Sequence, residues 1–200
     1  FLPRLPVYAA EIEVHLRRSG HTPFTEMLVL FLDRFAEQTL HFFFENDHVV
    51  EPKLFRLLRL SLESEKGGTL RKDLAARLEK YIMPLLADPA SPSRVFIALQ
   101  LLEPLVNSDP SFFSSAPAIY SRLLTLWCLR EFATLRRREA DVVYSQTRTT
   151  PLFVQLLRAA LVHTPNADTY IALLDLYTYR QACDVTPNTR FVYDHVCVHG

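Results

Sequence analysis

The stretch EPKLFRLLRLSL, residues 51–62, decides the fold, because two later stretches begin in the same way. They are APAIYSRLLTLW, residues 116–127, and TPLFVQLLRAAL, residues 150–161. In each, a proline is followed two or three positions later by an aromatic residue, and then by a Leu-Leu pair. Proline is favoured at the first position of an α-helix, so each stretch predicts the start of a helix.

The spacing of these prolines indicates a repeated unit. Pro117 and Pro151 are 34 residues apart, and Pro187 follows after another 36. Pro52 lies 99 residues before Pro151, which fits a period of 33–36 residues with a degenerate unit near Pro84. Two helices and two short turns fill such a period, and one helical hairpin cannot bury its own apolar face. We therefore expect neighbouring hairpins to stack into a continuous core.

The composition favours helices over the other fold classes. The chain has 200 residues, of which 49% are hydrophobic, with only 4 Gly but 13 Pro. Sandwiches, barrels and dinucleotide-binding folds need more glycine in their turns and loops. We predict an all-α chain, an α-solenoid of about five antiparallel helical hairpins that is irregular in its N-terminal half. An irregular helical bundle is the alternative.

Details within the chain support this organisation. Thr22 before Pro23 predicts a helix start, and Leu54, Leu57, Leu58 and Leu62 form one apolar stripe. We expect the backbone to be most flexible at Gly67-Gly68, which predicts a sub-boundary near residues 65–69. We expect residues 1–200 to form a single array, and a fragment of a longer chain, because the pattern is already under way at the first residue.

Charge and cysteine content restrict the partners and the compartment. There are 22 basic and 22 acidic residues, whereas tight nucleic-acid binders usually carry a basic excess. The three cysteines form no framework, which is typical of a reducing compartment. The most apolar stretch, MLVLFLDRF, is far too short to span a membrane. We expect an intracellular protein without a membrane span.

Two segments near the C-terminus, PNADTYIALLDLY (165–177) and TPNTRFVYDHV (186–196), resemble the start of a pentatricopeptide repeat. The resemblance covers at best residues 116–200. It implies a helical-hairpin solenoid of an organellar protein that binds single-stranded RNA or builds ribonucleoprotein assemblies. The segment at 165 departs from the family because it lies on the second arm of a hairpin. Tetratricopeptide repeats need a glycine that is missing here, whereas HEAT-like arrays remain open, particularly for residues 22–108.

Basic residues of the C-terminal half are the candidate binding site. Leu152 and Phe153 occupy positions where this family uses side chains that hydrogen-bond to RNA bases, but both are apolar. The resemblance therefore supports the family's fold more than its sequence-specific recognition of RNA bases. Glu139 and Asp141 follow the arginine run, which also fits an ordinary solvated helix face. The candidates for contact with RNA or an acidic partner are Arg136, Arg137, Arg138, Arg148, Asn188 and Arg190.

The sequence predicts neither catalysis nor a metal site. His195 and His199 have the i, i+4 spacing of zinc ligands, but no further ligands with structural spacing accompany them. No hydrolase, protease or nucleotide-binding signature is present. We therefore expect no enzyme activity, no cofactor, no metal and no small-molecule substrate.

These observations lead to one main functional expectation and two alternatives. The main expectation is a non-catalytic scaffold subunit of an organellar ribonucleoprotein, such as a mitochondrial ribosome or RNA-processing complex, with other proteins of the complex as partners and contact with RNA left open. The first alternative is a sequence-tolerant binder of single-stranded RNA. The second is a HEAT-like protein–protein adaptor in a transcription or trafficking complex.

Overall fold

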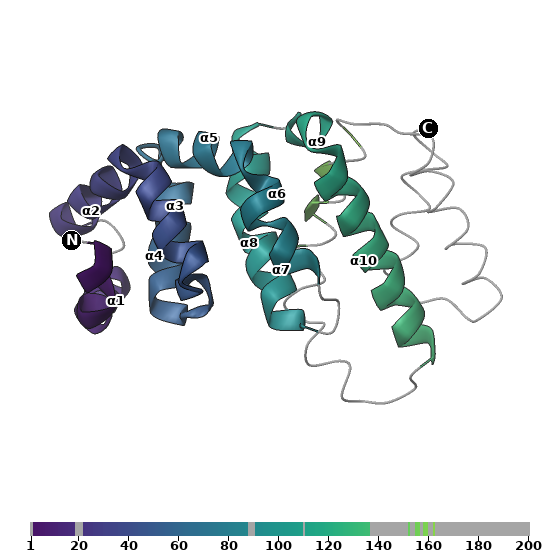
Figure 1. The fold of residues 1–200 in the computed structure, drawn as a ribbon, viewed down its shortest axis with the longest axis horizontal. Coiled ribbons are helices and arrows are strands. Elements are labelled where there is room, and N and C mark those ends of the chain that lie inside the picture. The colour runs from purple at the N-terminus through teal and green to yellow at the C-terminus, as the bar shows by residue number, and fades with distance from the viewer. Residues whose placement is uncertain are drawn as a thin grey trace. The chain divides into compact units, whose positions relative to one another are not determined.

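The computed structural model describes residues 2–18, 22–87, 91–109 and 111–136, together with positions 152, 155, 156, 158, 159 and 162. The chain divides into two compact units, Phe1–Asp109 and Pro110–Gly200, and each is described by itself below. Every regular element in the described residues is helical (Figure 1), which confirms the predicted all-α solenoid. The predicted single array over residues 1–200 stays a prediction.

The first unit contains eight α-helices and two 3-10 helices within its described residues. The elements are η1 (Leu2–Tyr8), α1 (Ala9–Arg18), α2 (Pro23–Arg34), α3 (Ala36–Glu45), η2 (His48–Val50), α4 (Pro52–Glu63), α5 (Gly68–Ala76), α6 (Leu78–Tyr81), α7 (Met83–Ala87) and α8 (Pro92–Ser108).

These helices form two layers. In one layer α1 packs on α4, and α4 packs on α8. In the other layer α2 and α3 both pack on α5, which continues into α6 and α7. The layers meet where α2 contacts α1 and α4, and where α7 contacts α8. Each helix thus contacts its equivalent in the next hairpin, as an α-solenoid requires.

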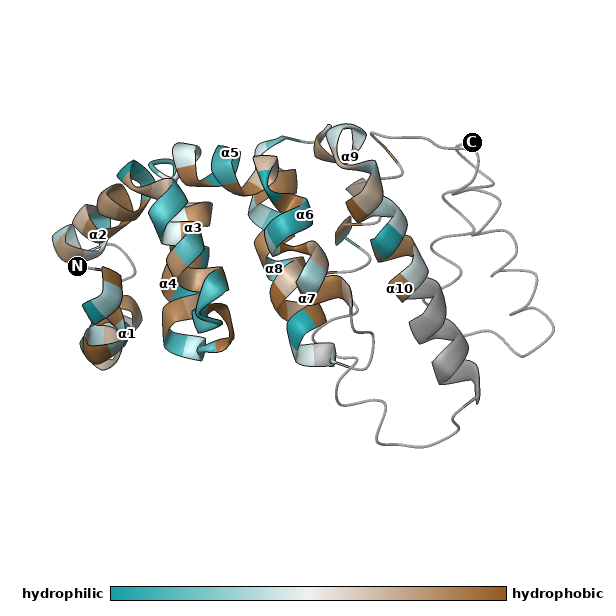
Figure 2. Cartoon of the chain, viewed as in Figure 1, coloured by the Kyte–Doolittle hydropathy of each residue, from teal (hydrophilic) through white to brown (hydrophobic). Residues whose placement is uncertain are grey.

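The predicted leucine stripe holds the layers together. Leu54, Leu57, Leu58 and Leu62 on α4 are fully buried, and so are Leu70 and Leu74 on α5. The i, i+3, i+4, i+8 spacing puts the four α4 leucines on one face, while charged residues occupy the other. Full burial of each leucine contributes about 1.5–3 kcal/mol. Figure 2 shows the same division of apolar and polar residues along the helices.

The second layer is built from broken helices. At Phe35 the backbone leaves helical geometry, with φ −112° and ψ 45°, and separates α2 from α3. The buried Thr39 hydroxyl donates a hydrogen bond to the Leu32 carbonyl at 3.0 Å, beside the break. A similar break at Arg77, with φ −126° and ψ 31°, separates α5 from α6, and Ile82 lies between α6 and α7. Helices in the other layer run without such breaks.

The glycine pair is a close-packed joint between α4 and α5. A Cβ on Gly67 would overlap the carbonyl oxygen of Ser61, so only glycine fits there. The Arg71 guanidinium donates hydrogen bonds to the carbonyls of Leu62 and Ser64, both at 2.6 Å, and so satisfies the C-terminus of α4. The chain is therefore closely packed at Gly67, and residues 65–69 lie inside the first unit, while the predicted flexibility of the glycine pair stays a prediction.

Ion pairs join successive hairpins. Among the described residues, six pairs link positions 35–47 apart in the sequence, which is close to the 40–47 residues of a HEAT repeat. The period of 33–36 residues predicted from the prolines is too short for this unit. In five of the six the acidic residue belongs to the earlier element. The pairs are Glu13–Lys53, Glu26–Lys66, Glu37–Arg77, Glu45–Lys80, Asp47–Arg94 and, in the opposite sense, Arg59–Glu103.

The ion pair between Glu45 on α3 and Lys80 on α6 shifts the pKa of both side chains. Its atoms Oε1 and Nζ lie 2.6 Å apart, and the aromatic rings of Phe44 and Tyr81 stack beside it with centroids 4.7 Å apart. The hydrogen bond from Lys80 and its charge hold the pKa of Glu45 below its ordinary value. Hydrogen bonds with Glu45 and with Tyr81 raise the pKa of Lys80.

The second unit contains α9 (Phe112–Ser115) and α10 (Pro117–Arg136) in its described part. Phe113 is fully buried, and its ring lies 5.9 Å from that of Tyr120 between centroids. Pro117 stands at the first position of α10, as the sequence predicts. Ile119 and Leu123 on α10 are buried as well, so this helix uses the same apolar spacing as α4.

Candidate protein-binding groove

The site residues predicted from the sequence are not tested by the structure. Arg136 is the last residue of α10, and the other five, Arg137, Arg138, Arg148, Asn188 and Arg190, lie outside the described residues. His195 and His199 lie outside them too. In the part of the chain that the structure describes, no three His, Cys, Asp or Glu residues gather as metal ligands, and no helix is long and apolar enough to cross a membrane.

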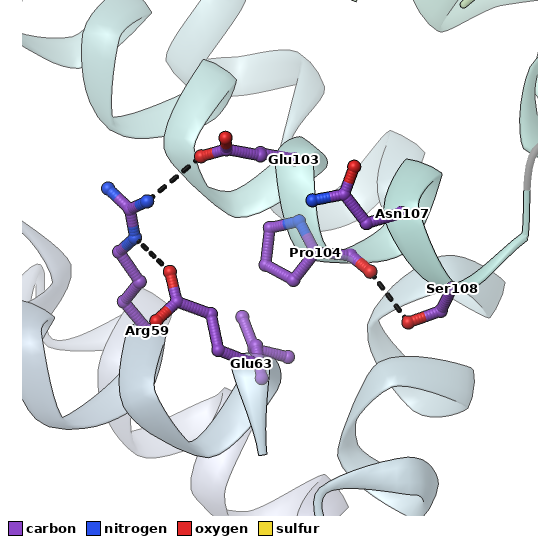
Figure 3. Close-up of a pocket in the computed structure, with 7 residues that line it drawn as sticks. Arg59, Glu63, Glu103, Pro104, Asn107 and Ser108 are labelled. Carbon is purple, nitrogen blue, oxygen red and sulfur yellow. Dashed lines mark hydrogen bonds and ion pairs between the residues drawn. The ribbon is translucent and has the colours of Figure 1, made fainter. Parts of the chain in front are cut away.

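The structure instead presents a groove where α4 faces α8. It consists of two adjoining hollows of about 400 and 460 Å³, which share Arg59 and Glu63 of α4. The first hollow (Figure 3) is lined by Arg59, Leu62, Glu63, Glu103, Pro104, Asn107 and Ser108. The second is lined by Leu16, Phe55, Arg56, Arg59, Leu60, Glu63 and Gln100. We call both together the α4–α8 groove.

Arg59 occupies the centre of the groove. Its Nε donates to Glu63 Oε1 at 2.6 Å, one turn along α4, and its Nη2 donates to Glu103 Oε2 on α8 at 2.9 Å (Figure 3). The Arg59 and Glu103 side chains are 28% and 21% exposed, so their contact is partly shielded from water. One guanidinium therefore ties two successive hairpins together and is held in a fixed orientation.

A proline shapes the α8 wall of the groove. Pro104 lies inside α8 and has no N–H, so the Gln100 carbonyl loses its usual helical donor. The Ser108 hydroxyl donates to the Pro104 carbonyl at 2.7 Å, one turn further along (Figure 3). The α8 wall therefore offers backbone and side-chain polar groups beside the buried Pro104 ring.

The second hollow combines apolar walls with a cation. Leu16 of α1 and Phe55 and Leu60 of α4 supply the apolar surface. Arg56 is exposed at its edge, and among the described residues no carboxylate pairs with it. An apolar hollow with one available guanidinium fits a protein segment that carries apolar side chains and a carboxylate.

The lining residues of the two hollows combine apolar side chains with charged ones. Neither hollow is lined by a histidine or a cysteine, and Arg59 is already hydrogen-bonded to both neighbouring carboxylates. Sequence reasoning missed this groove because Arg59 and Glu103 come from different hairpins. The signal that could have found it is the basic side of the α4 helix, Lys53, Arg56 and Arg59, placed against its leucine stripe.

The helices pack in two layers, and the residues that pair across hairpins lie 35–47 positions apart in the sequence. The helices of the second layer are broken. These features are those of a HEAT-type helical-repeat protein. The sequence profile of a family described as "Tra1 HEAT repeat ring region" matches residues 1–200. The chain belongs to this family.

Curated relatives agree with this assignment. The chain is 26% identical over 179 residues to the human transformation/transcription domain-associated protein, and 25% identical over 179 residues to the mouse protein. The zebrafish protein of the same name is 23% identical over 180 residues. Each alignment covers 82% of this chain but only 5–7% of the relative, so the chain spans a small part of their length. No solved structure matches.

The family corrects part of the sequence-based expectation. The helical-repeat assignment is confirmed, but the repeats are of the HEAT type, so the pentatricopeptide resemblance is not supported. The mitochondrial location and the RNA partner, which rested on that resemblance, are not supported either. The resemblance came from two short segments in residues 165–196, outside the described residues. The HEAT-like alternative accounts better for the whole chain.

Proposed function

We propose that this chain is a non-catalytic segment of a HEAT-repeat scaffold that holds other protein subunits of a transcription-regulating assembly in the nucleus. The family match over residues 1–200 carries the proposal. The names of the curated relatives supply the association with transcription. The two-layer array supports a scaffold role, because its stacked hairpins present a continuous surface.

Within that surface, the α4–α8 groove is the proposed contact for a partner. Leu16, Phe55 and Leu60 take up apolar side chains of the partner segment, and Arg56 binds its carboxylate. Arg59 keeps α4 and α8 in register and thereby fixes the width of the groove. The groove is lined by α1, α4 and α8, which belong to three successive hairpins, so the partner recognises their stacked arrangement.

Purification of the protein from its native source after nuclease treatment tests this proposal, with the co-purifying proteins measured by quantitative mass spectrometry. We expect Arg56→Glu to reduce a defined set of these proteins by roughly fivefold or more, since it replaces an attraction by a repulsion. Lys72→Glu is the matched control, because Lys72 is also exposed but lies on α5, outside the groove.

Two results would overturn the proposal. Equal recovery of all partners with Arg56→Glu and Lys72→Glu would remove the groove as the contact. Recovery of no protein partner after nuclease treatment, or recovery with mitochondrial ribonucleoprotein components, would remove the transcription-scaffold function itself.

A further inference from the structure

Two side-chain amides on α8 line the α4–α8 groove and have no hydrogen-bond partner among the described residues. Gln100 lines the second hollow and Asn107 the first, where Figure 3 shows it beside Glu103. Gln100, Glu103 and Asn107 follow one another at i, i+3 and i+7, so they share one face of α8. A side-chain amide has both a donor and an acceptor, so it can pair with a peptide group of another chain.

The opposite wall of the groove, on α4, carries charges and no amide. Arg56, Arg59 and Glu63 have the same i, i+3, i+7 spacing on this helix. Arg59 is bonded to Glu63 and to Glu103, which leaves the Arg56 guanidinium available. The α4 wall therefore offers a contact for a carboxylate side chain, whereas the α8 wall offers two contacts for a main chain.

The two helices that form the groove are in contact, which limits what fits between them. α4 packs on α8, and the hydrogen bond of 2.9 Å from Arg59 to Glu103 joins one wall to the other. Helices in contact have axes about 8–10 Å apart, whereas a further helix with its side chains is about 10–12 Å across. Such a helix lies over the groove and not in it, while a single extended chain can enter both hollows.

The spacing of the two amides fits an extended chain. Gln100 and Asn107 are seven positions apart, which is about 10.5 Å along the axis of α8. In the polyproline II conformation three residues complete one turn and advance about 9.3 Å, so that peptide groups three residues apart point the same way. This conformation has no internal hydrogen bonds, so its peptide groups are free to pair with the amides. The peptide groups of a helix are already bonded to one another.

From these contacts we propose that the partner protein enters the α4–α8 groove as an extended segment of the polyproline II type. The amides of Gln100 and Asn107 bind two of its peptide groups, three residues apart. A carboxylate of the segment pairs with Arg56, and an apolar side chain packs against Phe55 in the second hollow. The inference rests on the proposed function of the groove and adds the conformation in which the partner binds. Recognition through the main chain leaves the other side chains of the segment free to differ between partners.

Removal of each amide in the protein purified from its native source tests the contact. Gln100→Ala and Asn107→Ala should each lower the recovery of the proteins that Arg56→Glu removes by roughly threefold to tenfold, as the loss of one or two hydrogen bonds predicts. Gln38→Ala is the matched control, because Gln38 is an exposed amide on α3, outside the groove. Alanine favours helices and neither groove amide is bonded within the described residues, so both variants are expected to fold, which circular dichroism verifies.

Photo-crosslinking followed by peptide binding tests the conformation of the segment. p-Benzoylphenylalanine replaces Phe55 in the full-length protein, and the crosslinked segment is sequenced by mass spectrometry and synthesised as a fluorescent peptide. N-methylation of its peptide bonds, one at a time, should weaken binding at two bonds three residues apart. Gln100→Ala and Asn107→Ala should each abolish the effect of one of these methylations. A lactam between positions i and i+4, which holds the peptide helical, should weaken binding by roughly tenfold or more.

The outcomes separate this inference from the proposed function. Loss of partners with Arg56→Glu, but not with Gln100→Ala or Asn107→Ala, would overturn the main-chain contact and leave the groove as the contact surface. A lactam-bridged peptide that binds as tightly as the linear one would assign a helix to the groove and also overturn the inference. Recovery of partners that all three variants leave unchanged would remove the groove, and with it both the contact and the conformation proposed for it.

Discussion

The carboxylate of Asp33 on α2 accepts a hydrogen bond from the backbone N–H of Leu70, the third residue of α5, at 2.7 Å. One hairpin thus caps a helix of the next, since the first N–H groups of a helix have no partner within it. We expect Asp33→Ala to lower the free energy of unfolding by about 1 kcal/mol and Asp33→Asn by less. Urea denaturation measures this. Glu65→Ala, an exposed carboxylate without a described partner, should change it little.

The two adjacent glycines should respond in opposite directions to the same substitution. Gly67→Ala places a methyl group on the Ser61 carbonyl and should destabilise the protein by at least about 1–3 kcal/mol. Gly68→Ala should stabilise it by about 0.4–1 kcal/mol, because the added Cβ has only Arg71 Nη2 near it, at 4.0 Å, and the unfolded chain loses freedom. Thermal unfolding compares the two. Equal effects would contradict the packed joint.

The pair of Glu45 and Lys80 should make stability depend on pH at both ends of the scale. The pKa of Glu45 is lowered, so its stabilising contribution is present above the unfolded-state pKa and is lost as pH falls through the folded-state value. The pKa of Lys80 is raised, so its contribution is lost as pH rises through the folded-state value. In Lys80→Gln the carboxyl pKa of Glu45, measured by NMR titration, should return upward toward its ordinary value. High salt should have the same effect, since both side chains are exposed.

Arg59 should couple more strongly to Glu103 than to Glu63. The Glu103 side chain is 21% exposed and Glu63 46%, so solvent weakens the second pair more. A double-mutant cycle with Arg59→Met and Glu103→Gln should give a coupling of about 0.5–1 kcal/mol. The cycle with Glu63→Gln should give about 0.3–0.5 kcal/mol, as for other pairs one turn apart on a helix. A larger coupling to Glu63 would contradict the role of Arg59 between hairpins.

Helix starts and core positions could be predicted from local patterns. Thr22 and Pro23 begin α2 with a capping box, and Pro52, Pro92 and Pro117 begin helices as their chemistry requires. Leu54 and Leu62 are buried as their spacing predicts. Phe42 and Phe43 on α3 are buried too and belong to the core.

The remaining features depend on contacts that no local pattern contains. Pro104 lies inside α8 although an interior proline removes a helical hydrogen bond, because tertiary packing outweighs the lost bond. Gly67-Gly68 looks flexible, although the Ser61 carbonyl fills the space where a side chain would lie. The groove needs Arg59 and Glu103 on facing hairpins. The predicted arginine cluster stays a prediction, since only Arg136 among its six residues lies within a described helix.

The broken helices of the second layer have a mechanical consequence. α4 and α8 run for 12 and 17 residues without interruption, whereas the opposite layer is segmented at Phe35, Arg77 and Ile82. Successive helix segments can change direction at these junctions, so a change in the curvature of the first unit would be taken up mainly in this layer, while the leucine core between the layers stays buried.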